Sequence, residues 1–471
     1  MFKLEDILKA TSGVVICQGQ EQFNGVSIDT RMIEPNDLFI AIKGERYDGH
    51  DFLDSSQAML AGAVIQRVDQ QSSETANKTI ILVADTLKAL QNIARYHRKK
   101  ESPLVIAVTG SNGKTTAKEM TAAVQSMEKN TLKSQGNFNN QIGLPLTLCQ
   151  IDSHDVVVVE MGARACGDIR ELCEIAAPDI GIITNIGAAH LEGFGSLEGV
   201  RKAKLEMMDY VEKLLINADD RFLSTGVIDK LTEDSSRHLE LYTYGINNDA
   251  DFKAVEVSEN PKGMGISFTI KFPNNEYQKI RLKTGGIFNV YNALAACGAG
   301  YLTGINKESM AEALSDYSGV SMRFEMQSLM GAVVINDAYN ANPASIRASV
   351  TETVRLKQTR AIVVLGDMLE LGIYSIEEHR KLGQWLASMD IDVFIALGPM
   401  MKYAHAQYVS RLSNGRSKSA FHMEDTDRAR RIIFELIQEK DTILIKGSRA
   451  MGMENIIRVT ENIGDCIPNI K

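Results

Sequence analysis

The chain lacks any long apolar run. No stretch of its 471 residues approaches the roughly 20 uninterrupted apolar residues that a membrane-spanning helix needs. The first segment, MFKLEDILKATSG, alternates charged and apolar residues and lacks the continuous apolar core of a secretory signal peptide. We therefore expect a protein of the cytoplasm, with no membrane association.

Cysteines and basic clusters are also sparse. The six cysteines are scattered, and the seven-position spacing of Cys166 and Cys173 fits no zinc site, so we expect reduced structural thiols. The formal net charge is −9, and no basic run exceeds a few residues. These features argue against a nucleic-acid partner. An anionic ligand would need a local binding site, because the electrostatic field of a protein with net negative charge does not attract anions.

Internal repeats and low-complexity segments are absent as well, so the length has to be explained by domains. A chain of 471 residues is too long for one hydrophobic core and suggests about three domains. Polar segments at 101–103 and 317–319 mark the expected boundaries. We expect domains at residues 1–101, 102–318 and 319–471.

Apolar β-like runs alternate with helical patterns, which favours mainly parallel sheets covered by helices. The expected strands are 38–42, 63–65, 79–83, 104–108, 156–160, 180–185, 332–335, 361–365, 393–397 and 442–445. The expected helices are 86–99, 169–176, 197–213, 290–302, 345–357, 376–389 and 426–439. The predicted fold class is α/β with three domains. The third domain is expected to be Rossmann-like, although no G-x-G-x-x-G motif accompanies it.

A glycine-rich loop, TGSNGKTT at 109–116, joins an expected strand to an expected helix. The usual phosphate-binding loop has a glycine five positions before the Gly-Lys pair. Here that position is Val108, and the nearest upstream glycine is Gly110. The loop nevertheless supplies glycines for close approach, Lys114 for phosphates and the Thr115 hydroxyl for Mg²⁺. It predicts a nucleotide triphosphate site. The alternative is a glycine-rich turn with an incidental lysine.

Two polar residues follow expected strands of the same domain. Glu160 ends the run DVVVVE, at the edge where parallel sheets bind ligands, and carboxylates suit Mg²⁺. It could also simply close a strand. His190 lies just past the next strand in a loop of small residues. It suits a metal or phosphate role, or it is an ordinary loop histidine.

Lys204 lies in an apolar stripe of the next expected helix. Positions 200, 204, 208 and 211 share one face and read Val, Lys, Met, Val. Lys202, by contrast, has Glu198 four residues before it and Glu206 four residues after it, as expected for a solvated, ion-paired lysine. A lysine on a buried face either extends its amine to solvent or has a perturbed pKa and a function.

These motifs, with others along the chain, resemble the ATP-dependent Mur ligases of peptidoglycan precursor synthesis. The resemblance covers essentially the whole chain, and the short phosphate loop is itself a feature of that family. The segments that carry it are SIDTR (27–31), GERYDGH (44–50), TGSNGKTT (109–116), GNFNNQIGLP (136–145), EMG (160–162), NIGAAH (185–190), AK (203–204), GIFNVYN (286–292), Arg323 and NDAYNANP (336–343).

The resemblance implies that ATP phosphorylates a substrate carboxylate and that an amine then displaces the phosphate. It implies one Mg²⁺ at Thr115 and Glu160, and a second at His190 and a carbamylated Lys204. Lys114 would contact ATP phosphates with the loop residues Gly110, Ser111, Asn112, Gly113, Thr115 and Thr116. Adenine would meet Asn289 and Asn292, while phosphate and ribose would meet Arg323 and Asp337. Substrate contacts are expected at Ser27, Asp29, Thr30, Arg31, His50, Asn137, Asn139 and Asn140.

Within the family, the third domain resembles the member that adds a dipeptide. The segments VLGDMLELG (364–372) and KGSR (446–449) carry this likeness. The sibling that adds the third amino acid has an Asp-Asn-Pro-Arg motif, which this chain lacks. The implied substrates are UDP-N-acetylmuramoyl-tripeptide and D-alanyl-D-alanine, and we expect the chain to act as a monomer.

Three alternatives remain at this point. The chain could be another amino-acid-adding ligase of the family, or a relative of folylpolyglutamate synthase. It could also be an ATP-driven switch or binding protein with no ligation. A guanine-nucleotide switch is disfavoured because no N-K-x-D motif occurs.

Overall fold

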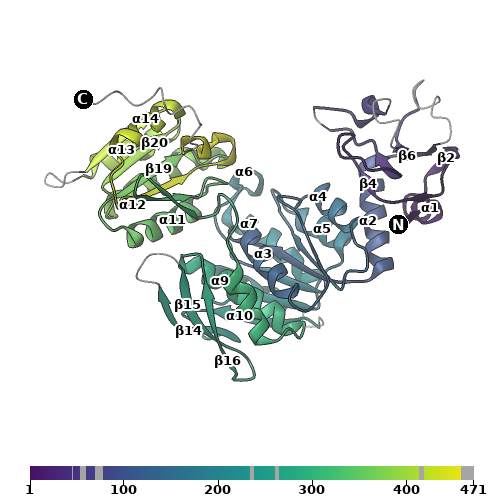
Figure 1. The fold of residues 1–471 in the computed structure, drawn as a ribbon, viewed down its shortest axis with the longest axis horizontal. Coiled ribbons are helices and arrows are strands. Elements are labelled where there is room, and N and C mark those ends of the chain that lie inside the picture. The colour runs from purple at the N-terminus through teal and green to yellow at the C-terminus, as the bar shows by residue number, and fades with distance from the viewer. Residues whose placement is uncertain are drawn as a thin grey trace.

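The computed structural model describes residues 1–44, 46–53, 60–68, 78–233, 238–259, 265–412 and 418–457. Glu45, within the GERYDGH segment, and Cys466 lie outside the described residues. Three large sheets follow one another along the chain, and Figure 1 shows them as three separate bodies, with the middle one between the other two. The three-domain α/β fold expected from the alternating patterns is confirmed.

The first sheet has the strand order β2-β7-β6-β5-β4. Its pairs are parallel except for β2 with β7. The elements of this part are β1 (Phe2–Lys3), α1 (Leu4–Thr11), β2 (Val14–Cys17), β3 (Gln22–Phe23), β4 (Val26–Ser27), β5 (Asp37–Ile40), η1 (Gly49–Phe52), β6 (Leu60–Ile65), β7 (Thr79–Leu82) and α2 (Thr86–Glu101). Helix α2 leads into the second part, where Arg98 Nε donates to the carbonyl of Ala176 at 2.8 Å.

The central sheet has the order β16-β15-β14-β13-β12-β11-β8-β10-β9 within the described residues. Its strands are β8 (Leu104–Thr109), β9 (Thr131–Lys133), β10 (Val156–Glu160), β11 (Ile180–Ile183), β12 (Lys213–Asn217), β13 (Glu240–Gly245), β14 (Phe252–Glu259), β15 (Ile266–Lys271) and β16 (Tyr277–Leu282). The pairs from β9 to β14 are parallel, whereas β14, β15 and β16 pair antiparallel. The antiparallel extension was not predicted.

Helices cover both faces of the parallel part of the central sheet (Figure 1). They are α3 (Lys114–Gln125), α4 (Gly143–Leu148), α5 (Asp168–Ala176), α6 (Leu191–Phe194), α7 (Leu197–Leu205), α8 (Arg221–Glu233), α9 (Ile287–Leu302) and α10 (Lys307–Asp316). The prediction of a single helix over 197–213 is wrong in its extent, because the α-helix ends at Leu205. Helix α7 gives way to the 3₁₀ turn η4 (Glu206–Asp209), where Glu206 accepts from the backbone at the start of α5, and strand β12 begins at Lys213.

The third sheet has the order β17-β18-β22-β19-β20-β21, and only the β17–β18 pair is antiparallel. Its strands are β17 (Glu325–Leu329), β18 (Ala332–Asn336), β19 (Ala361–Gly366), β20 (Val393–Leu397), β21 (Ser419–Met423) and β22 (Thr442–Lys446). Its helices are α11 (Pro343–Leu356), α12 (Ser375–Ser388), α13 (Met401–Ser410) and α14 (Thr426–Leu436), with short 3₁₀ turns η5 (Gly372–Tyr374), η6 (Arg449–Met451) and η7 (Met453–Ile456). The expected strands and helices of this part are confirmed to within three residues.

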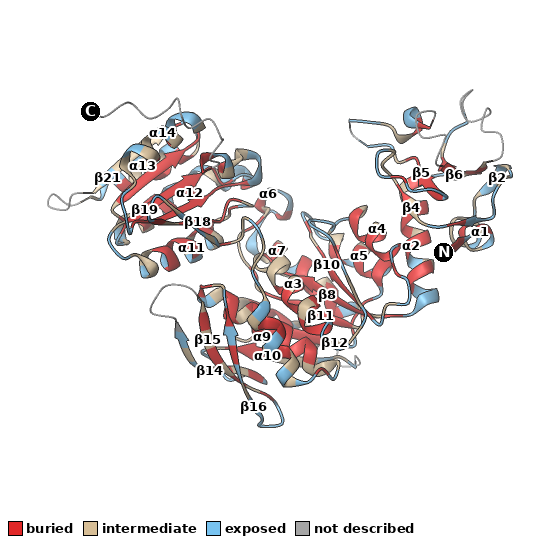
Figure 2. Ribbon diagram, viewed as in Figure 1, coloured by how far each residue is buried: buried red, intermediate tan, exposed pale blue. Residues whose placement is uncertain are grey.

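Each part has an apolar cluster of its own, and one larger cluster joins buried residues of all three parts. Buried residues follow the sheets and the helices that cover them (Figure 2). Strand β10 is buried along its whole length, which explains why its sequence is a continuous apolar run. Cys149, Cys173 and Cys297 are buried in these cores, while Cys166 is exposed. In the described part of the chain, no helix has the length and apolarity to cross a membrane.

Candidate functional site

The glycine-rich loop connects β8 to α3 and needs glycine at two positions. Gly110 and Gly113 have φ values of 140° and 81°, which residues with a Cβ rarely adopt. A Cβ on Gly110 would lie 2.0 Å from Oγ1 of Thr184, and one on Gly113 would lie 2.6 Å from Oδ1 of Asn292. The loop therefore passes close to neighbouring elements on both sides, and its short form depends on these glycines.

The loop is held in place by the segment that follows β11. The Asn112 amide N–H donates to Oδ1 of Asn185 at 3.0 Å, and the carbonyl of Asn112 accepts from Nδ2 of Asn185 at 2.9 Å. Ser111 exchanges hydrogen bonds with the backbone of Gly187 through its hydroxyl. Asn185 belongs to the NIGAAH segment (185–190), but it is not among the site residues predicted from the sequence. Its place at the end of an expected strand, within a segment that carries the family resemblance, is the signal that could have found it.

Lys114 begins helix α3 and folds back over the loop. Its Nζ donates to the carbonyls of Gly110 at 2.8 Å and Ser111 at 3.2 Å. Burial lowers the pKa of Lys114, the Glu160 carboxylate opposes this shift, and the Arg323 guanidinium adds to it. The ammonium group is thus held at the N-terminus of a helix, where the backbone also favours an anion.

Glu160 ends strand β10 beside this loop and is only 3% exposed. Its two carboxylate oxygens accept hydrogen bonds at 2.8 Å, one from the Thr115 hydroxyl and one from the Asn139 side-chain amide. The sequence hypothesis that Thr115 and Glu160 share a metal is consistent with this contact. Asn139, predicted to contact substrate, contacts Glu160 here.

The donor set around Glu160 consists of one carboxylate and one hydroxyl. Among the described residues, no cluster of three His, Cys, Asp or Glu side chains could hold a metal alone. Mg²⁺ at nucleotide sites usually takes only one or two protein carboxylates and completes its shell with phosphate and water oxygens. One carboxylate and one hydroxyl 2.8 Å apart therefore fit Mg²⁺ bound with a nucleotide.

Glu160→Gln is expected to lower both the apparent affinity for Mg²⁺ and the activity, by about 10- to 100-fold. The amide keeps the shape of the side chain but removes the negative charge. Titration of activity against Mg²⁺ would detect the change. An unchanged titration curve would remove Glu160 from the metal site.

Lys204 lies on the buried face of α7, as the stripe predicted. Val200, Lys204 and Met208 are all at most 3% exposed, and Nζ of Lys204 lies 5.8 Å from the centre of the Phe194 ring. Burial and, to a smaller extent, the nearby Lys114 lower the pKa of Lys204 to about 7, against the opposing effect of carboxylates that include Glu160. The amine is therefore partly neutral near neutral pH, and it is not extended to solvent.

Lys202 is exposed, as expected, but its predicted ion pairs are not present among the described contacts. Glu198 accepts from Arg201 at 2.9 Å instead. Glu206 accepts from the backbone N–H groups of Gly167 and Arg170, because the helix turns into a 3₁₀ segment at that point. The prediction of a paired Lys202 was wrong, while its exposure was correct.

His190 precedes helix α6 and has the left-handed φ of 52°. Its Nδ1 lies 2.6 Å from Oε2 of Glu370 in the third domain. Burial lowers the pKa of His190, and the Glu370 carboxylate opposes that shift. The sequence did not predict Glu370, which belongs to a loop 180 positions further along the chain.

Asn289 and Asn292 lie in the first turns of α9, next to the glycine-rich loop. Both are buried, and Nδ2 of Asn292 donates to Oδ1 of Asn289 at 3.3 Å. Nδ2 of Asn289 donates to the carbonyl of Gly285 at 2.7 Å. These bonds fix the orientation of two amides that line the same cavity as the loop.

The third domain reaches the loop through Arg323. Its Nη2 donates to Oγ1 of Thr115 at 3.2 Å, and its guanidinium carbon lies 3.8 Å from the centre of the Tyr339 ring. Within the described residues, Nε of Arg323 is buried without a hydrogen-bond partner. A buried donor without a partner is costly, and an anionic ligand in this cavity would satisfy it.

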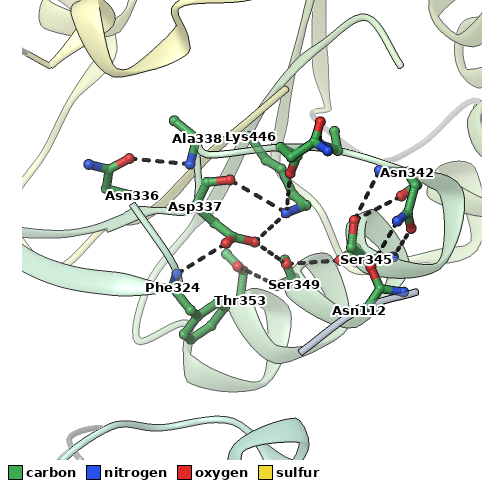
Figure 3. Close-up of polar contacts among 12 residues, drawn as sticks. Asn112, Phe324, Asn336, Asp337, Ala338, Asn342, Ser345, Ser349, Thr353 and Lys446 are labelled. Carbon is green, nitrogen blue, oxygen red and sulfur yellow. Dashed lines mark hydrogen bonds and ion pairs between the residues drawn. The ribbon is translucent and has the colours of Figure 1, made fainter. Parts of the chain in front are cut away.

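Asp337 forms a buried polar network in the third domain (Figure 3). Its Oδ2 accepts from Nζ of Lys446 at 2.6 Å and from the hydroxyl of Ser349 at 2.5 Å, and its Oδ1 accepts from the amide N–H of Phe324 at 3.1 Å. Burial lowers the pKa of Lys446, and the Asp337 carboxylate opposes this shift.

A second bridge between the two domains lies beside this network. Nδ2 of Asn342 donates to Oδ1 of Asn112 at 2.8 Å (Figure 3). Asn342 also caps helix α11, because its Oδ1 accepts from the amide N–H of Ser345. The glycine-rich loop is therefore in contact with a helix N-terminus of the third domain.

These residues surround one cavity of about 870 Å³ between the second and third domains. The predicted site residues that line it are Gly110, Ser111, Asn112, Gly113, Lys114, Thr115, Thr116, Asn137, Asn139, Asn140, Glu160, His190, Lys204, Asn289, Asn292, Arg323 and Asp337. The structure thus brings together the candidates chosen from two domains.

Three domain models of one family match residues 22–98 (Mur ligase family, catalytic domain), 108–300 (Mur ligase middle domain) and 322–449 (Mur ligase, glutamate ligase domain). The chain belongs to the Mur ligase family.

Individual Mur ligases match over nearly the whole chain. The UDP-N-acetylmuramoyl-tripeptide--D-alanyl-D-alanine ligase of Bacillus subtilis is 36% identical, over 97% of both chains. The enzyme of that name from Escherichia coli is 34% identical, over 94% of this chain and 95% of its own. Among solved structures, MurF from Acinetobacter baumannii aligns with a TM-score of 0.86 at 29% identity, over 97% of both chains. MurF ligase from Thermotoga maritima in complex with ADP aligns with a TM-score of 0.79 at 25% identity, over 92% of this chain and 96% of its own.

The first-domain candidates of this Mur ligase do not line the cavity. Ser27, Asp29, Thr30, Arg31 and His50 lie in the separate first body (Figure 1). Arg31 and Asp29 form an exposed ion pair at 2.6 Å, which lowers the pKa of Asp29 to about 2. His50 is 1% exposed.

Both ring nitrogens of His50 already have partners. Nε2 accepts from the amide N–H of Gln66 at 3.0 Å, and Nδ1 lies 2.6 Å from Oδ1 of Asp48. In this arrangement the neutral ring carries its proton on Nδ1. His50 therefore holds the loop at Asp48 against the backbone of Gln66, whereas the guanidinium of Arg31 is exposed to solvent.

Proposed function

We propose that this chain is the ATP-dependent ligase that joins D-alanyl-D-alanine to UDP-N-acetylmuramoyl-tripeptide in peptidoglycan synthesis. The products would be the pentapeptide precursor, ADP and phosphate. The observation that carries this proposal is the full-length match to relatives of that name at 36% and 34% identity. The cavity between the second and third domains supplies the chemistry that such a reaction needs.

The reaction has to activate a carboxylate, because a bare carboxylate has no usable leaving group. Transfer of the terminal phosphoryl group of ATP to the tripeptide carboxylate would give an acyl phosphate and ADP. The free amine of D-alanyl-D-alanine would then attack the carbonyl carbon, and the tetrahedral intermediate would release phosphate and form the amide. Both steps concentrate negative charge, so they need fixed positive groups.

Lys114 and Arg323 are the cations placed to meet that charge. Lys114 lies at the N-terminus of α3, and Arg323 donates to Thr115 from the third domain. Asn289 and Asn292 would contact adenine, and Asp337 would accept hydrogen bonds from the ribose. The family likeness implies these roles, and all of these residues line the one cavity, which supports the proposal.

Magnesium fits beside Thr115 and Glu160, and a second ion would need His190 and a carboxylated amine at Lys204. Bound Mg²⁺ would supply charge neutralisation for the phosphoryl group. Carbamylation requires a neutral amine. The burial of Lys204 and its pKa of about 7 support that requirement, since carbon dioxide reacts only with the unprotonated form.

The nucleotide end of the other substrate is proposed to bind the first domain, at Ser27, Asp29, Thr30, Arg31 and the loop that His50 shapes. Asn137 and Asn140, which line the cavity, would contact the peptide part. The substrate would then span all three domains. Closure of the domains would exclude water from the acyl phosphate, which water would otherwise hydrolyse. We propose that the enzyme acts as a monomer in the cytoplasm.

Release of phosphate identifies the acceptor. With ATP, Mg²⁺ and UDP-N-acetylmuramoyl-tripeptide, we expect phosphate release only when D-alanyl-D-alanine is added, and mass spectrometry should detect the pentapeptide product. Tripeptides that end in lysine and in meso-diaminopimelate should both be tried. Release triggered by single amino acids would indicate a different ligase of the family. Release that is independent of any amine would indicate an ATP-driven switch.

A further inference from the structure

The loop at 367–374 of the third domain is built as a rigid projection. Oδ1 of Asp367 accepts from the amide N–H of Met401 at 2.7 Å, at the start of α13. The amide N–H of Met368 donates to Nε2 of His379 at 3.2 Å, and that of Leu369 donates to the hydroxyl of Ser448 at 2.8 Å. The backbone on the N-terminal side of Glu370 is therefore fixed to its own domain by three separate anchors.

This projection docks on the segment around α6 in the central domain. The carbonyl of Glu370 accepts from the amide N–H of Glu192 at 3.3 Å, and the hydroxyl of Tyr374 donates to the carbonyl of Gly195 at 3.0 Å. Gly372 packs so closely that a Cβ on it would lie 3.3 Å from Cα of Glu192. The two domains thus meet at a specific backbone contact, next to His190.

The side chains at this contact are also aligned. Glu370 and His190 both have left-handed backbone conformations, with φ values of 61° and 52°. These are uncommon for residues with a Cβ and persist only where the surroundings favour them. They place Oε2 of Glu370 2.6 Å from Nδ1 of His190, and both residues line the cavity with Glu160 and Lys204.

Oε2 of Glu370 lies within ion-pair distance of Nδ1, although the two atoms do not meet hydrogen-bond geometry in this arrangement. A carboxylate so close to Nδ1 favours a proton on that nitrogen. With the proton on Nδ1, Nε2 is left with its lone pair. Histidines that bind metals almost always use one nitrogen for the metal and direct the other toward a carboxylate, carbonyl or water. In this chain the carboxylate comes from a different domain than the histidine.

We propose that Glu370 is a positioning residue, which reaches from the third domain, orients the His190 imidazole through Nδ1 and leaves Nε2 available to a divalent cation. This role rests on the metal site of the proposed function. It follows that the second ion is bound tightly only when the third domain is docked. Docking would therefore complete the metal site in the same movement that brings Arg323 to Thr115.

The experiment measures Mn²⁺ binding to the full-length wild-type and Glu370→Gln chains in the presence of a non-hydrolysable ATP analogue. Electron paramagnetic resonance monitors the binding. Wild type should bind two Mn²⁺ ions. In Glu370→Gln, the affinity for the weaker ion is expected to fall by about 10- to 100-fold, with the tighter ion and the analogue unchanged. In steady-state assays, kcat should fall while KM for ATP stays the same. Glu370→Asp, which keeps the charge, should recover part of the loss.

Glu377→Gln is the matched control, because Glu377 is an exposed glutamate of α12 outside the cavity and should bind both ions as wild type does. Wild-type affinity for both ions in Glu370→Gln would overturn the inference. A Glu370→Gln chain that also loses affinity for the analogue and melts at a lower temperature would indicate a general packing role and would overturn it as well. A wild-type chain that binds only one Mn²⁺ ion would do the same. Pentapeptide formation by the same wild-type sample tests the proposed reaction separately.

Discussion

Lys204→Arg is expected to reduce kcat for ligation by about a thousandfold or more, whereas Lys202→Arg should leave it nearly unchanged. Loss of a single group that stabilises transition-state charge already costs roughly 10²- to 10³-fold, and this substitution would remove a metal ligand as well. Coupled measurement of ADP and pentapeptide formation at saturating substrates checks the prediction.

The reason lies in the chemistry of the two side chains. A carbamate forms on a neutral amine, and burial keeps the pKa of Lys204 near 7. An arginine guanidinium stays protonated and cannot carry a carbamate. Arginine would therefore place a permanent cation where an anionic oxygen ligand is expected. Lys202 lies two residues away but is exposed, so it controls for the helix itself.

Further variants separate loss of the carbamate from a general effect of the substitution. Lys204→Ala should be equally inactive, and added formate should restore part of its activity, because a small carboxylate can occupy the space of the missing carbamate. Comparable losses in Lys202→Arg and Lys204→Arg would contradict the argument from the helix face. Full activity in Lys204→Arg would remove the carbamate from the mechanism.

Lys446→Met should destabilise the third domain by about 3–5 kcal/mol, which is the usual effect of removing one partner from a buried ion pair. Nζ of Lys446 lies 2.6 Å from Oδ2 of Asp337 (Figure 3). It also donates to the carbonyl of Asn340 at 2.9 Å. Methionine fills much of the volume but leaves the buried carboxylate without its cation. Calorimetry of the separate domain transitions would measure the loss.

Nucleotide affinity should fall in the same variant, because Asp337 lines the cavity and would lose its orientation. Lys402→Met on the exposed side of α13 is the matched control and should stay within about 0.5 kcal/mol of wild type. Asp337→Asn in the Lys446→Met background removes the uncompensated charge and should recover much of the stability. A Lys446→Met chain as stable as the control would contradict this account.

Much of the site could be predicted because its residues follow local patterns. The loop from Gly110 to Thr115 is recognisable from a strand, glycines and a Gly-Lys pair. Glu160 follows from a carboxylate at the end of an apolar run, and Lys204 from its helical spacing to Val200 and Met208. Each signal depends on neighbours within about ten positions, where periodicity directly reports burial.

Other features could not be predicted because they depend on contacts between distant segments. The antiparallel pairs of β14, β15 and β16 were not recognised among the alternating patterns. Helix α7 ends at Leu205, where Glu206 of the following turn is bound by backbone N–H groups at the start of α5. Lys202 lacks its expected partners for the same reason, since Glu206 is used by the backbone of another helix.

By itself the sequence determined the class of each domain, the phosphate loop and the family, because these depend on hydrophobic periodicity and on short motifs. Only the tertiary structure decided which side chains meet across the second and third domains. Arg323 with Thr115, Asn342 with Asn112 and Glu370 with His190 are each separated by 180 or more positions. Such contacts arise when separately folded surfaces dock, and their geometry is set by the packing of both domains rather than by any pattern within one segment.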